Sequence, residues 1–484
     1  MKAEQNGGQA SSLKHQPEEH PLDGLAKGLA NSTISRREAL KLLGGASLGL
    51  LALPVFPSTA SAAGTLQPPS KTSLGKFRGV EYFQYAGLFV GETSTGKYSV
   101  PYRISAPANP RSANGSTVLV EPPHFSQGTF LRESYLGRSF LFNRGFVHAS
   151  VGYSTGAPPF SGVTISNRIL DPAANGVFID GGVVLPGEDE DSRTDDEIIV
   201  DFARALRSDS ARGLIGPAAR RYLAGFSDSA EPVKRIVTSG LAEGIFDMAL
   251  PITTGSENDP QVSIAARKYS GKVISVASEF EWYWGRALED RGTSPNHNQY
   301  RYFIVPGTPH IADPLCDGSL GNRTTPAGWQ PALRAHFLQG HDWVTQGVAP
   351  PASTRLKTTP SGAIARDSKG NALLVDITGV SAPRLPFVEL GEARFIVPIP
   401  GATEPPGLLL GTYAPQPPPN VEQLGFPSFD AYLAAFEKAL NAQKQAGYMH
   451  KEDAKVLLER ANLSPPATFT QNYHSRYELF RSCM

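Results

Sequence analysis

The stretch Arg220-Arg-Tyr-Leu-Ala-Gly-Phe-Ser-Asp-Ser-Ala230 predicts a short strand, a sharp corner and then a helix. Small residues stand at Gly225, Ser229 and Ala230, on both sides of Ser227. A strand and a helix that meet at so tight a corner pass close together, and the residues two before and two after its centre must therefore be small. The pattern predicts that Ser227 lies at the corner, with its hydroxyl held out beyond the end of a sheet.

A serine at such a corner is typical of a nucleophile elbow. The first backbone N–H group of the following helix, from Asp228, would point at any negative charge that develops beside the Ser227 hydroxyl. The pattern Gly-x-Ser-x-Ser is weak by itself, because a helix that merely begins with Ser or Asp would show it too. The role of Ser227 therefore depends on what the rest of the chain places near it.

The composition bounds the class of protein. The chain has 484 residues, no net formal charge and 40% hydrophobic residues, which is typical of a globular protein with a large core. A neutral balance argues against nucleic acid as a partner. The two cysteines, Cys316 and Cys483, have no metal-binding spacing, although they could form one disulfide in an oxidising compartment. No metal ion and no organic cofactor is expected.

Residues 1–62 are interpreted as an export signal rather than as part of the fold. Residues 1–33 are polar and are predicted to be disordered. The pair Arg36-Arg37 precedes the apolar run Leu42–Phe56, which is too short to span a bilayer comfortably, and Ala60-Ser-Ala62 follows as a small-residue cleavage site. The two arginines resemble a twin-arginine signal, so we expect the mature protein in the periplasm or outside the cell, without stable membrane insertion. The alternatives are an uncleaved anchor and a buried helix.

Residues 70–484 are expected to form one α/β domain. Largely apolar predicted strands alternate with helical patterns, as a mostly parallel central sheet flanked by helices requires. An antiparallel meander comes first, over Val80–Val90 and Lys97–Ser105. The later predicted strands are Ser116–Glu121, Gly145–Gly152, Tyr222–Gly225, Ile245–Ile252, Lys272–Ala277 and Tyr300–Val305, and the helices among them are Phe130–Arg144, Asp195–Arg207 and Pro232–Gly240.

Two of the later strands end next to residues that could act with Ser227. Glu279 and Glu281 follow one of these strands, and His310 follows the next. The carboxyl ends of parallel strands meet at one edge of a sheet, and serine, acid and histidine in this chain order are typical of an α/β-hydrolase triad. His310 lies in a loop, as a general base should, and it is preferred to His341, which lies within a predicted helix.

The acid is assigned to Glu281, with Glu279 as the alternative. Both would face the same way in an extended strand, so alternation cannot separate them. Because the apolar strand ends at Ala277, Glu279 lies close to the sheet edge, whereas Glu281 lies in the following turn, from which a carboxylate can reach His310. Glu279 would then pair with a nearby arginine such as Arg286.

Several segments match a known bacterial family in their order and spacing. They are Tyr98–Arg103, Val118–Glu121, Arg144–Gly152, Gly225–Ser229, Ser278–Glu281, Tyr300–His310 and Trp343–Pro351, together with the C-terminal helices. Over most of residues 75–465 the chain resembles the exported "alpha/beta hydrolase domain-containing" proteins, which continue far beyond the catalytic histidine. The resemblance implies an α/β-hydrolase fold and a serine hydrolase for small-molecule carboxylic esters, with Ser227, Glu281 and His310 as its triad. The chain departs from the pattern at Ser229, where many hydrolases have glycine.

The oxyanion hole is expected to combine the Asp228 N–H group with a donor from the loop after the strand Ser116–Glu121. His124 and Phe125 lie in that loop, although His124 could equally be a substrate contact or an ordinary loop histidine. Asp228 also brings a carboxylate close to the oxyanion. The cluster Trp282-Tyr-Trp284 could line an apolar pocket, but such clusters more commonly pack in a core.

The residues from about 312 onward exceed what a minimal α/β hydrolase needs. We expect them to pack around the sheet and to shape the mouth of the pocket, and the alternative is a separate binding module. Helical spacing predicts helices in this region, and apolar runs predict short strands. The helices are Pro331–Gln346, Phe429–Gln445 and Lys451–Ala461, and the strands are Ala372–Thr378 and Arg394–Pro398.

Two other functions are compatible with the same residues. The chain could be a non-catalytic binding protein on a hydrolase scaffold, or an acyltransferase or lyase that uses the same triad. Labelling by a fluorophosphonate probe distinguishes an enzyme from a non-catalytic binding protein, because a scaffold without activity has no activated serine. The ester and the oligomeric state stay open, because fold and triad are shared by many chemistries.

Changing both Arg36 and Arg37 to Lys is expected to block export. The change keeps the charge but removes the paired arginines that a twin-arginine signal requires. Cell fractionation should find the double-Lys protein in the cytoplasm and the wild type in the periplasm. Arrival of the double-Lys protein in the periplasm by the same route would show that the signal is misread.

Overall fold

The structure is a computed structural model that describes residues 64–94, 96–123, 136–153, 192–282, 288–292, 298–310, 327–397, 411–414 and 420–463. These residues belong to one compact unit, Leu50–Met484. The expected signal, residues 1–62, lies outside the described residues, as do Cys316 and Cys483. Within the described ranges, no helix is both long and apolar enough to cross a membrane.

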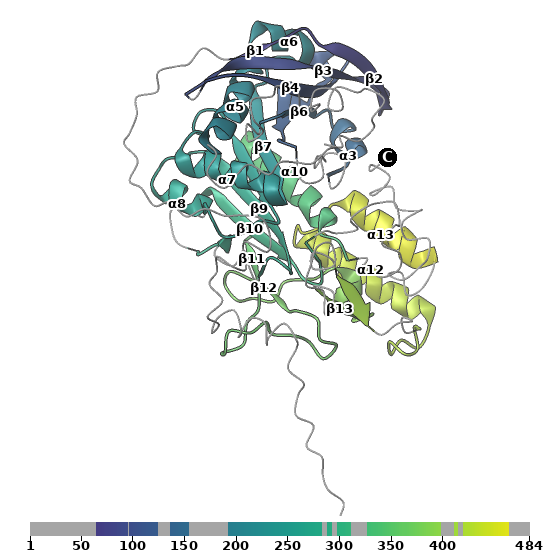
Figure 1. Cartoon of the computed structure of the whole chain (residues 1–484). Helices are drawn as coiled ribbons and strands as arrows, with labels where there is room; N and C mark the ends of the chain where they lie inside the picture. The colour runs from purple at the N-terminus through teal and green to yellow at the C-terminus, as the bar shows by residue number, and fades with distance from the viewer. Residues whose placement is uncertain are drawn as a thin grey trace, which may run out of the picture. The chain divides into compact units, whose positions relative to one another are not determined.

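Ten strands of the described chain form the central sheet (Figure 1). They are β1 Thr65–Leu66, β2 Ser70–Phe77, β3 Val80–Thr93, β4 Gly96–Pro107, β5 Thr117–Val120, β6 Val147–Val151, β7 Arg220–Phe226, β8 Met248–Ile252, β9 Lys272–Ser278 and β10 Tyr300–Val305. Their order along the sheet is β1-β3-β4-β6-β5-β7-β8-β9-β10, with β2 paired to β3. Pairing is antiparallel up to β6 and parallel from β6 to β10. The predicted α/β architecture and the predicted meander are confirmed.

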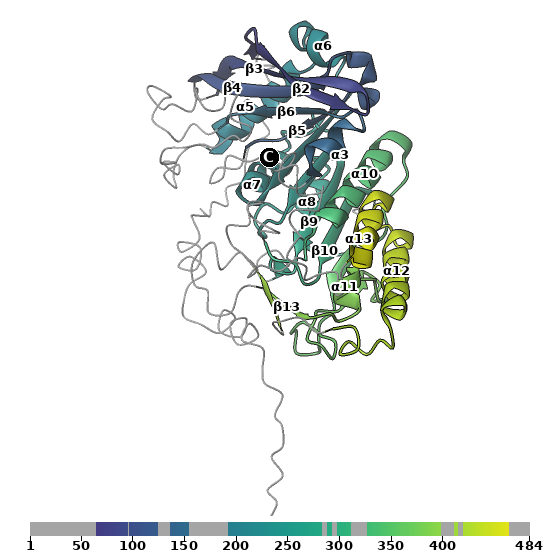
Figure 2. The ribbon, with the colours of Figure 1, turned by 90° about the vertical axis from the view of Figure 1, so that its right-hand side faces the viewer.

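Alternate residues of the parallel strands are buried on opposite faces of the sheet. In β5, for example, Val118 and Val120 belong to one apolar cluster and Leu119 belongs to the other. The helices divide in the same way. Helices α5 (Ser192–Ala205), α6 (Asp209–Ile215), α7 (Ala230–Ser239) and α8 (Pro260–Ala265) contribute to the first cluster, and α3 (Arg138–Phe142), α10 (Gln330–Gln346), α12 (Phe429–Gln445) and α13 (Lys451–Leu463) contribute to the second. Figure 2 shows α7 on one side of the strands and α10, α12 and α13 on the other. Burial on both faces explains why these strands are apolar throughout.

The structure corrects several predicted bounds and adds short elements. The strand predicted from Ile245 begins at Met248, because Ile245 and Phe246 form a turn in which both backbone N–H groups donate to Ala242 O. The helix predicted from Asp195 begins at Ser192. Strand β2 and helices α6 and α8 were not predicted. β2 is largely polar, and α6 and α8 are too short to show a helical period.

The C-terminal region begins, within the described chain, at residue 327 and covers the last strand of the sheet. Ser353 Oγ accepts a hydrogen bond from Tyr302 N at 3.0 Å, and Thr354 Oγ1 accepts one from Ile304 N at 3.2 Å. Ser353 Oγ donates in turn to Asp290 Oδ2 at 2.6 Å. Side-chain hydroxyls therefore satisfy N–H groups of β10 that another strand would otherwise have to pair.

Three tight turns organise the next part of the C-terminal region. Each ends at a glycine with positive φ whose N–H group donates to the carbonyl three residues earlier. They are Thr359–Gly362, Asp367–Gly370 and Asp376–Gly379, with φ of +84°, +86° and +89° at the glycines. The strands before, between and after these turns are short: β11 Thr354–Leu356, β12 Leu374–Asp376, β13 Arg394–Ile396 and β14 Thr412–Ala414, with α11 over Pro386–Glu389. The strand predicted over Ala372–Thr378 is confirmed at its centre, as β12, and the strand predicted over Arg394–Pro398 is confirmed over its first three residues, as β13.

Buried Arg334 joins two C-terminal helices to each other and to the rest of the fold. Arg334 of α10 donates from Nε to Leu136 O at 2.8 Å and pairs with Asp453 of α13 at 3.1 Å. Burial raises the pKa of the Asp453 carboxyl to about 6, against the opposing effect of the Arg334 charge. The region from residue 327 thus shares a core and a buried polar contact with the sheet-bearing part of the chain.

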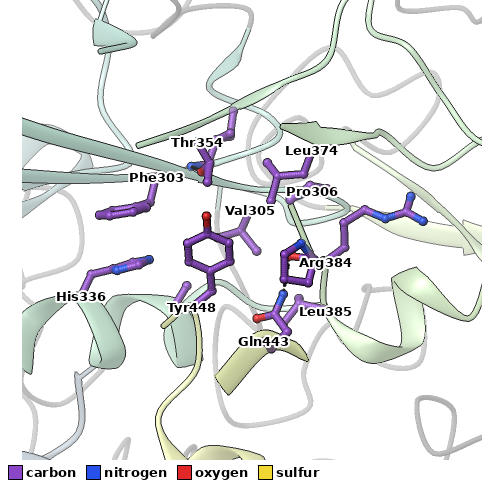
Figure 3. A pocket seen from close by; sticks show the side chains of 13 residues that line it. Phe303, Val305, Pro306, His336, Thr354, Leu374, Arg384, Leu385, Gln443 and Tyr448 are labelled. Carbon is purple, nitrogen blue, oxygen red and sulfur yellow. Dashed lines mark hydrogen bonds between the residues drawn. The ribbon is translucent and has the colours of Figure 1, made fainter. Parts of the chain in front are cut away.

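A small cavity lies between β10 and the C-terminal region (Figure 3). It measures about 20 Å³, which is room for about one water molecule. His336 of α10 lines it and stacks on Phe303, with ring centroids 3.4 Å apart. Tyr448 stands beside the stacked pair in the same view. Burial lowers the pKa of His336 to about 3, so this imidazole is neutral, with Nδ1 bonded to Gln339 at 2.8 Å.

His336 is expected to make folding less favourable in acid. Its pKa is near 3 when folded and about 6.5 when unfolded, so the unfolded chain takes up a proton first as the pH falls. The free energy of unfolding should therefore drop by about 2 kcal/mol between about pH 7 and about pH 5 because of this one group. Urea titrations should show a smaller drop for His336→Gln.

The matched control is His341→Gln, because His341 is only half-buried, and the nearby Asp342 carboxylate opposes the lowering of its pKa by burial. This control should remove a smaller part of the pH dependence. Equal drops for the wild type and His336→Gln would contradict the expectation.

Candidate active site

Ser227 lies at the corner between the central strand β7 and helix α7. The strand ends at Phe226, and a single 3-10 turn, Ser227–Ser229, leads into the helix. Ser227 has φ of +52°, a left-handed conformation that is costly for a residue with a Cβ atom. A Cβ atom on Gly225 would lie only 2.0 Å from Ser229 O, so a side chain there has no room. The predicted corner is present, and the close approach of strand and helix explains why its residues are small.

The Ser229 hydroxyl holds this corner closed. It accepts a hydrogen bond from Phe226 N and donates one to Phe226 O, both at 2.9 Å. Ser229 is 2% exposed, so water does not compete for these bonds. A glycine at this position, as in many hydrolases, would fit but would supply neither bond.

His310 lies directly against Ser227. Its Nε2 atom is 2.8 Å from Ser227 Oγ, and the residue sits five positions beyond the end of β10. The Trp329 Nε1–H group donates to His310 O at 3.3 Å. The rings of Phe226 and Phe280 flank the imidazole, with centroids 5.3 and 5.9 Å away. Sequence reasoning missed Trp329 and the two phenylalanines, because apolar residues beside a site look like ordinary core residues.

Glu281 occupies the other side of the imidazole. Its Oε1 atom is bonded to His310 Nδ1, and its Oε2 atom accepts hydrogen bonds from Ser278 N at 2.8 Å and Ser278 Oγ at 2.5 Å. The carboxylate is 1% exposed. With Nδ1 donating to Glu281, Nε2 is the acceptor that faces the Ser227 hydroxyl. The geometry thus suits proton transfer from Ser227 Oγ to His310.

Glu279 lies apart from the imidazole nitrogens. It forms an ion pair with Arg366 at 3.0 Å and accepts a hydrogen bond from Gly307 N at 2.6 Å. The suggested partner, Arg286, lies outside the described residues. An arginine does pair with Glu279, but it comes from the C-terminal region.

The remaining predicted residues divide between described and undescribed parts of the chain. Asp228 is exposed and is the middle residue of the 3-10 turn, whereas His124 and Phe125 lie outside the described residues. His341 bonds to Tyr222 Oη at 2.8 Å, on the face covered by α10. Trp282 is 7% exposed and belongs to the apolar cluster to which α5 and α7 contribute, and the other two residues of its aromatic run are not described.

Tyr153 contacts the last described residue before the loop that was predicted to supply the second oxyanion donor. Its hydroxyl donates to Pro123 O at 3.4 Å, immediately before His124. Burial raises the pKa of this hydroxyl well above its ordinary value, and the nearby Asp195 carboxylate acts in the same direction. The phenol therefore remains a hydrogen-bond donor. In the described part of the chain, no group of three or more His, Cys, Asp or Glu side chains is arranged to hold a metal ion.

Comparisons with known proteins concern both the sequence and the fold. The sequence profile of a family described as an alpha/beta hydrolase domain matches residues 86–459. No curated protein sequence matches the chain. A similar solved structure is the rice cell wall degrading esterase LipA from Xanthomonas oryzae, at 14% identity and a TM-score of 0.28, covering 40% of this chain and 51% of the esterase.

Two further esterases have similar structures. A CE15 glucuronoyl esterase from Teredinibacter turnerae T7901 is 12% identical, with a TM-score of 0.31 over 48% of this chain and 66% of that one. Acetyl xylan esterase 1 from Thermoanaerobacterium sp. JW/SL YS485 is 12% identical, with a TM-score of 0.29 over 50% of this chain and 80% of that one. The chain spans about half the length of LipA.

Replacing Gly225 with Ala is expected to disrupt the corner. The new methyl group would meet backbone atoms of Ser229 and Ala230, which cannot move without moving β7 or α7. The free energy of unfolding should fall by about 1–3 kcal/mol, as for other overpacked sites. Chemical denaturation measures this loss. Gly213→Ala is the matched control, because a Cβ atom there would meet nothing within 4 Å. Equal stabilities of the two variants would contradict the close approach at Gly225.

Proposed function

Because the chain belongs to the alpha/beta hydrolase domain family, we propose that it is a serine hydrolase that cleaves carboxylic esters of small molecules. The observation that carries the proposal is the line of contacts from Ser227 Oγ through both nitrogens of His310 to Glu281. The left-handed conformation of Ser227 supports it, because such strain persists where the surroundings over-determine it and is common in active sites.

In the proposed first step, Ser227 becomes acylated. His310 Nε2 takes the hydroxyl proton while Ser227 Oγ forms a bond to the ester carbonyl carbon, whose oxygen gains the electron pair of the carbonyl π bond. Glu281 orients the imidazole through Nδ1 and stabilises its positive charge. When the intermediate collapses, the bond to the alcohol oxygen breaks, and this oxygen leaves with the proton from Nε2.

In the second step, water replaces the alcohol. His310 takes a proton from water as its oxygen attacks the acyl carbon, and Ser227 Oγ leaves with that proton, releasing the carboxylic acid. In both steps the oxyanion would accept a hydrogen bond from the Asp228 N–H group. The second donor is proposed to come from His124 or Phe125, which directly follow Pro123, whose carbonyl accepts a hydrogen bond from Tyr153. None of these steps requires a metal ion or an organic cofactor.

The proposed site of action is the periplasm or the outside of the cell. The motivation is the order Arg36-Arg37, apolar run and Ala60-Ser-Ala62 at the start of the chain. An acyltransferase would follow the same first step but would use an alcohol in place of water. Product analysis in the presence of added alcohols distinguishes the two reactions.

Replacing Ser227 with Ala is expected to abolish hydrolysis of p-nitrophenyl acetate and labelling by a fluorophosphonate probe. Without Oγ no acyl enzyme forms, so kcat should fall by at least about 10³-fold. Ser239→Ala, at the far end of α7, is the matched control and should keep wild-type labelling. A Ser227→Ala protein that still reacts with the probe at the wild-type rate would refute the proposed nucleophile.

The same assay separates the two carboxylates. Glu281→Gln should lower kcat by about 10⁴-fold, because the imidazole loses the partner that sets its tautomer. Glu279→Gln should have a much smaller effect, since an amide oxygen can still accept the hydrogen bond from Gly307 N. A larger loss of kcat in Glu279→Gln than in Glu281→Gln would show that Glu279, not Glu281, orients His310.

A further inference from the structure

The Glu279 carboxylate joins two parts of the chain that approach the site from different sides. One oxygen is paired with Arg366 of the C-terminal region at 3.0 Å, and the other accepts from Gly307 N at 2.6 Å. The carboxylate is 2% exposed and the Arg366 side chain is 14% exposed. A charge buried to this extent depends on its partner, because an unpaired buried carboxylate is strongly destabilising.

Gly307 belongs to the short loop that ends at His310. It has φ of +77°, which favours glycine. A Cβ atom on Gly307 would lie 3.2 Å from both Phe395 Cβ and Val388 Cγ2, so these two side chains of the C-terminal region pack directly against the loop. The backbone of the loop is thus held by a carboxylate on one side and by apolar side chains on the other.

Arg366 is itself fixed by the hairpin that carries it. It pairs with Ala372 in a β-bridge, and its NH1 group donates to Gly370 O at 3.1 Å. The neighbouring Asn371 donates from Nδ2 to Ala393 O and accepts from Phe395 N, both at 2.8 Å. The segment that supplies Arg366 and the segment that supplies Phe395 are therefore cross-linked.

We propose that Arg366 and Glu279 are positioning residues that hold His310 in register with Ser227, so that the C-terminal region is part of the working site rather than only its cover. The inference rests on the proposed serine hydrolase function. Arg366 fixes Glu279, and Glu279 fixes Gly307 N, three residues before His310. The imidazole must meet Ser227 Oγ and Glu281 at once, and a displacement of about 1 Å can cost about 10²-fold in rate.

The first part of the test removes the ion pair. The kcat and KM for p-nitrophenyl acetate are measured per active site, after titration with the fluorophosphonate probe, so that loss of folded protein does not count as loss of rate. Arg366→Met should lower kcat by about 10-fold to 100-fold and change KM little, because the loop moves but no substrate contact is lost. The double variant Arg366→Met/Glu279→Gln should recover only part of the loss: no buried charge is left unpaired, but the introduced glutamine lacks the anchor that Arg366 supplies. Arg355→Met, at an exposed position of β11, is the matched control and should match the wild type.

The second part isolates the acceptor for Gly307 N. The double variants Arg366→Met/Glu279→Gln and Arg366→Met/Glu279→Leu both lack the ion pair and have side chains of similar size. Only Gln can accept the Gly307 N–H group, so kcat should be about 10-fold lower with Leu. This comparison decides the question if Arg366→Met alone does not fold.

Wild-type kcat per titrated site in Arg366→Met, or equal kcat in the two double variants, would overturn the inference and leave the proposed function standing. A wild-type protein that does not react with the probe would overturn the proposed function and the inference with it.

Discussion

The close approach of strand β7 and helix α7 at Gly225 is the constraint on which the rest of the site depends. With 2.0 Å between a hypothetical Cβ atom and Ser229 O, the chain can turn this sharply only through a residue without a side chain. The turn forces Ser227 into its left-handed conformation, which costs about 1–3 kcal/mol. Two hydrogen bonds of the Ser229 hydroxyl and the pairing of β7 with both β5 and β8 offset this cost.

The parallel register brings the acid and the histidine to the same place. Ser278, the last residue of β9, pairs with Val305, the last residue of β10. Glu281 and His310 therefore leave the sheet at the same level, next to Ser227 beyond the end of β7. Because Ser278 also binds the Glu281 carboxylate through its N–H group and hydroxyl, the strand end both delivers the acid and orients it. The site is thus built from strand ends, and the helices serve mainly to cover the sheet.

Much of this arrangement could be predicted from local sequence. Apolar runs predicted the parallel strands, and the small residues around Ser227 predicted the corner. Position relative to the strand end was enough to place Glu281 rather than Glu279 opposite His310. These features are local, so short stretches of sequence contain them.

The features that escaped prediction depend on contacts between distant residues. Arg366 is far from Glu279 in the chain, and nothing in the composition of its hairpin marks it as a partner. Strand β2 is mostly polar, and strand β11, with three residues, is too short for a visible period. Trp329 looks like any core tryptophan until its bond to His310 O is seen.

The way in which the C-terminal region completes the sheet has a consequence for synthesis. A nascent chain that has just finished β10 presents an uncovered edge and one apolar face that α10, α12 and α13 have yet to bury. Arg78, close to the start of the described chain, contacts Glu452 of α13, 374 residues later. Contacts between residues so far apart in the sequence form late and slowly. Until they form, uncovered strand edges can pair with other chains. We therefore expect the chain to be prone to aggregation while it emerges from the ribosome, until its last helices are available.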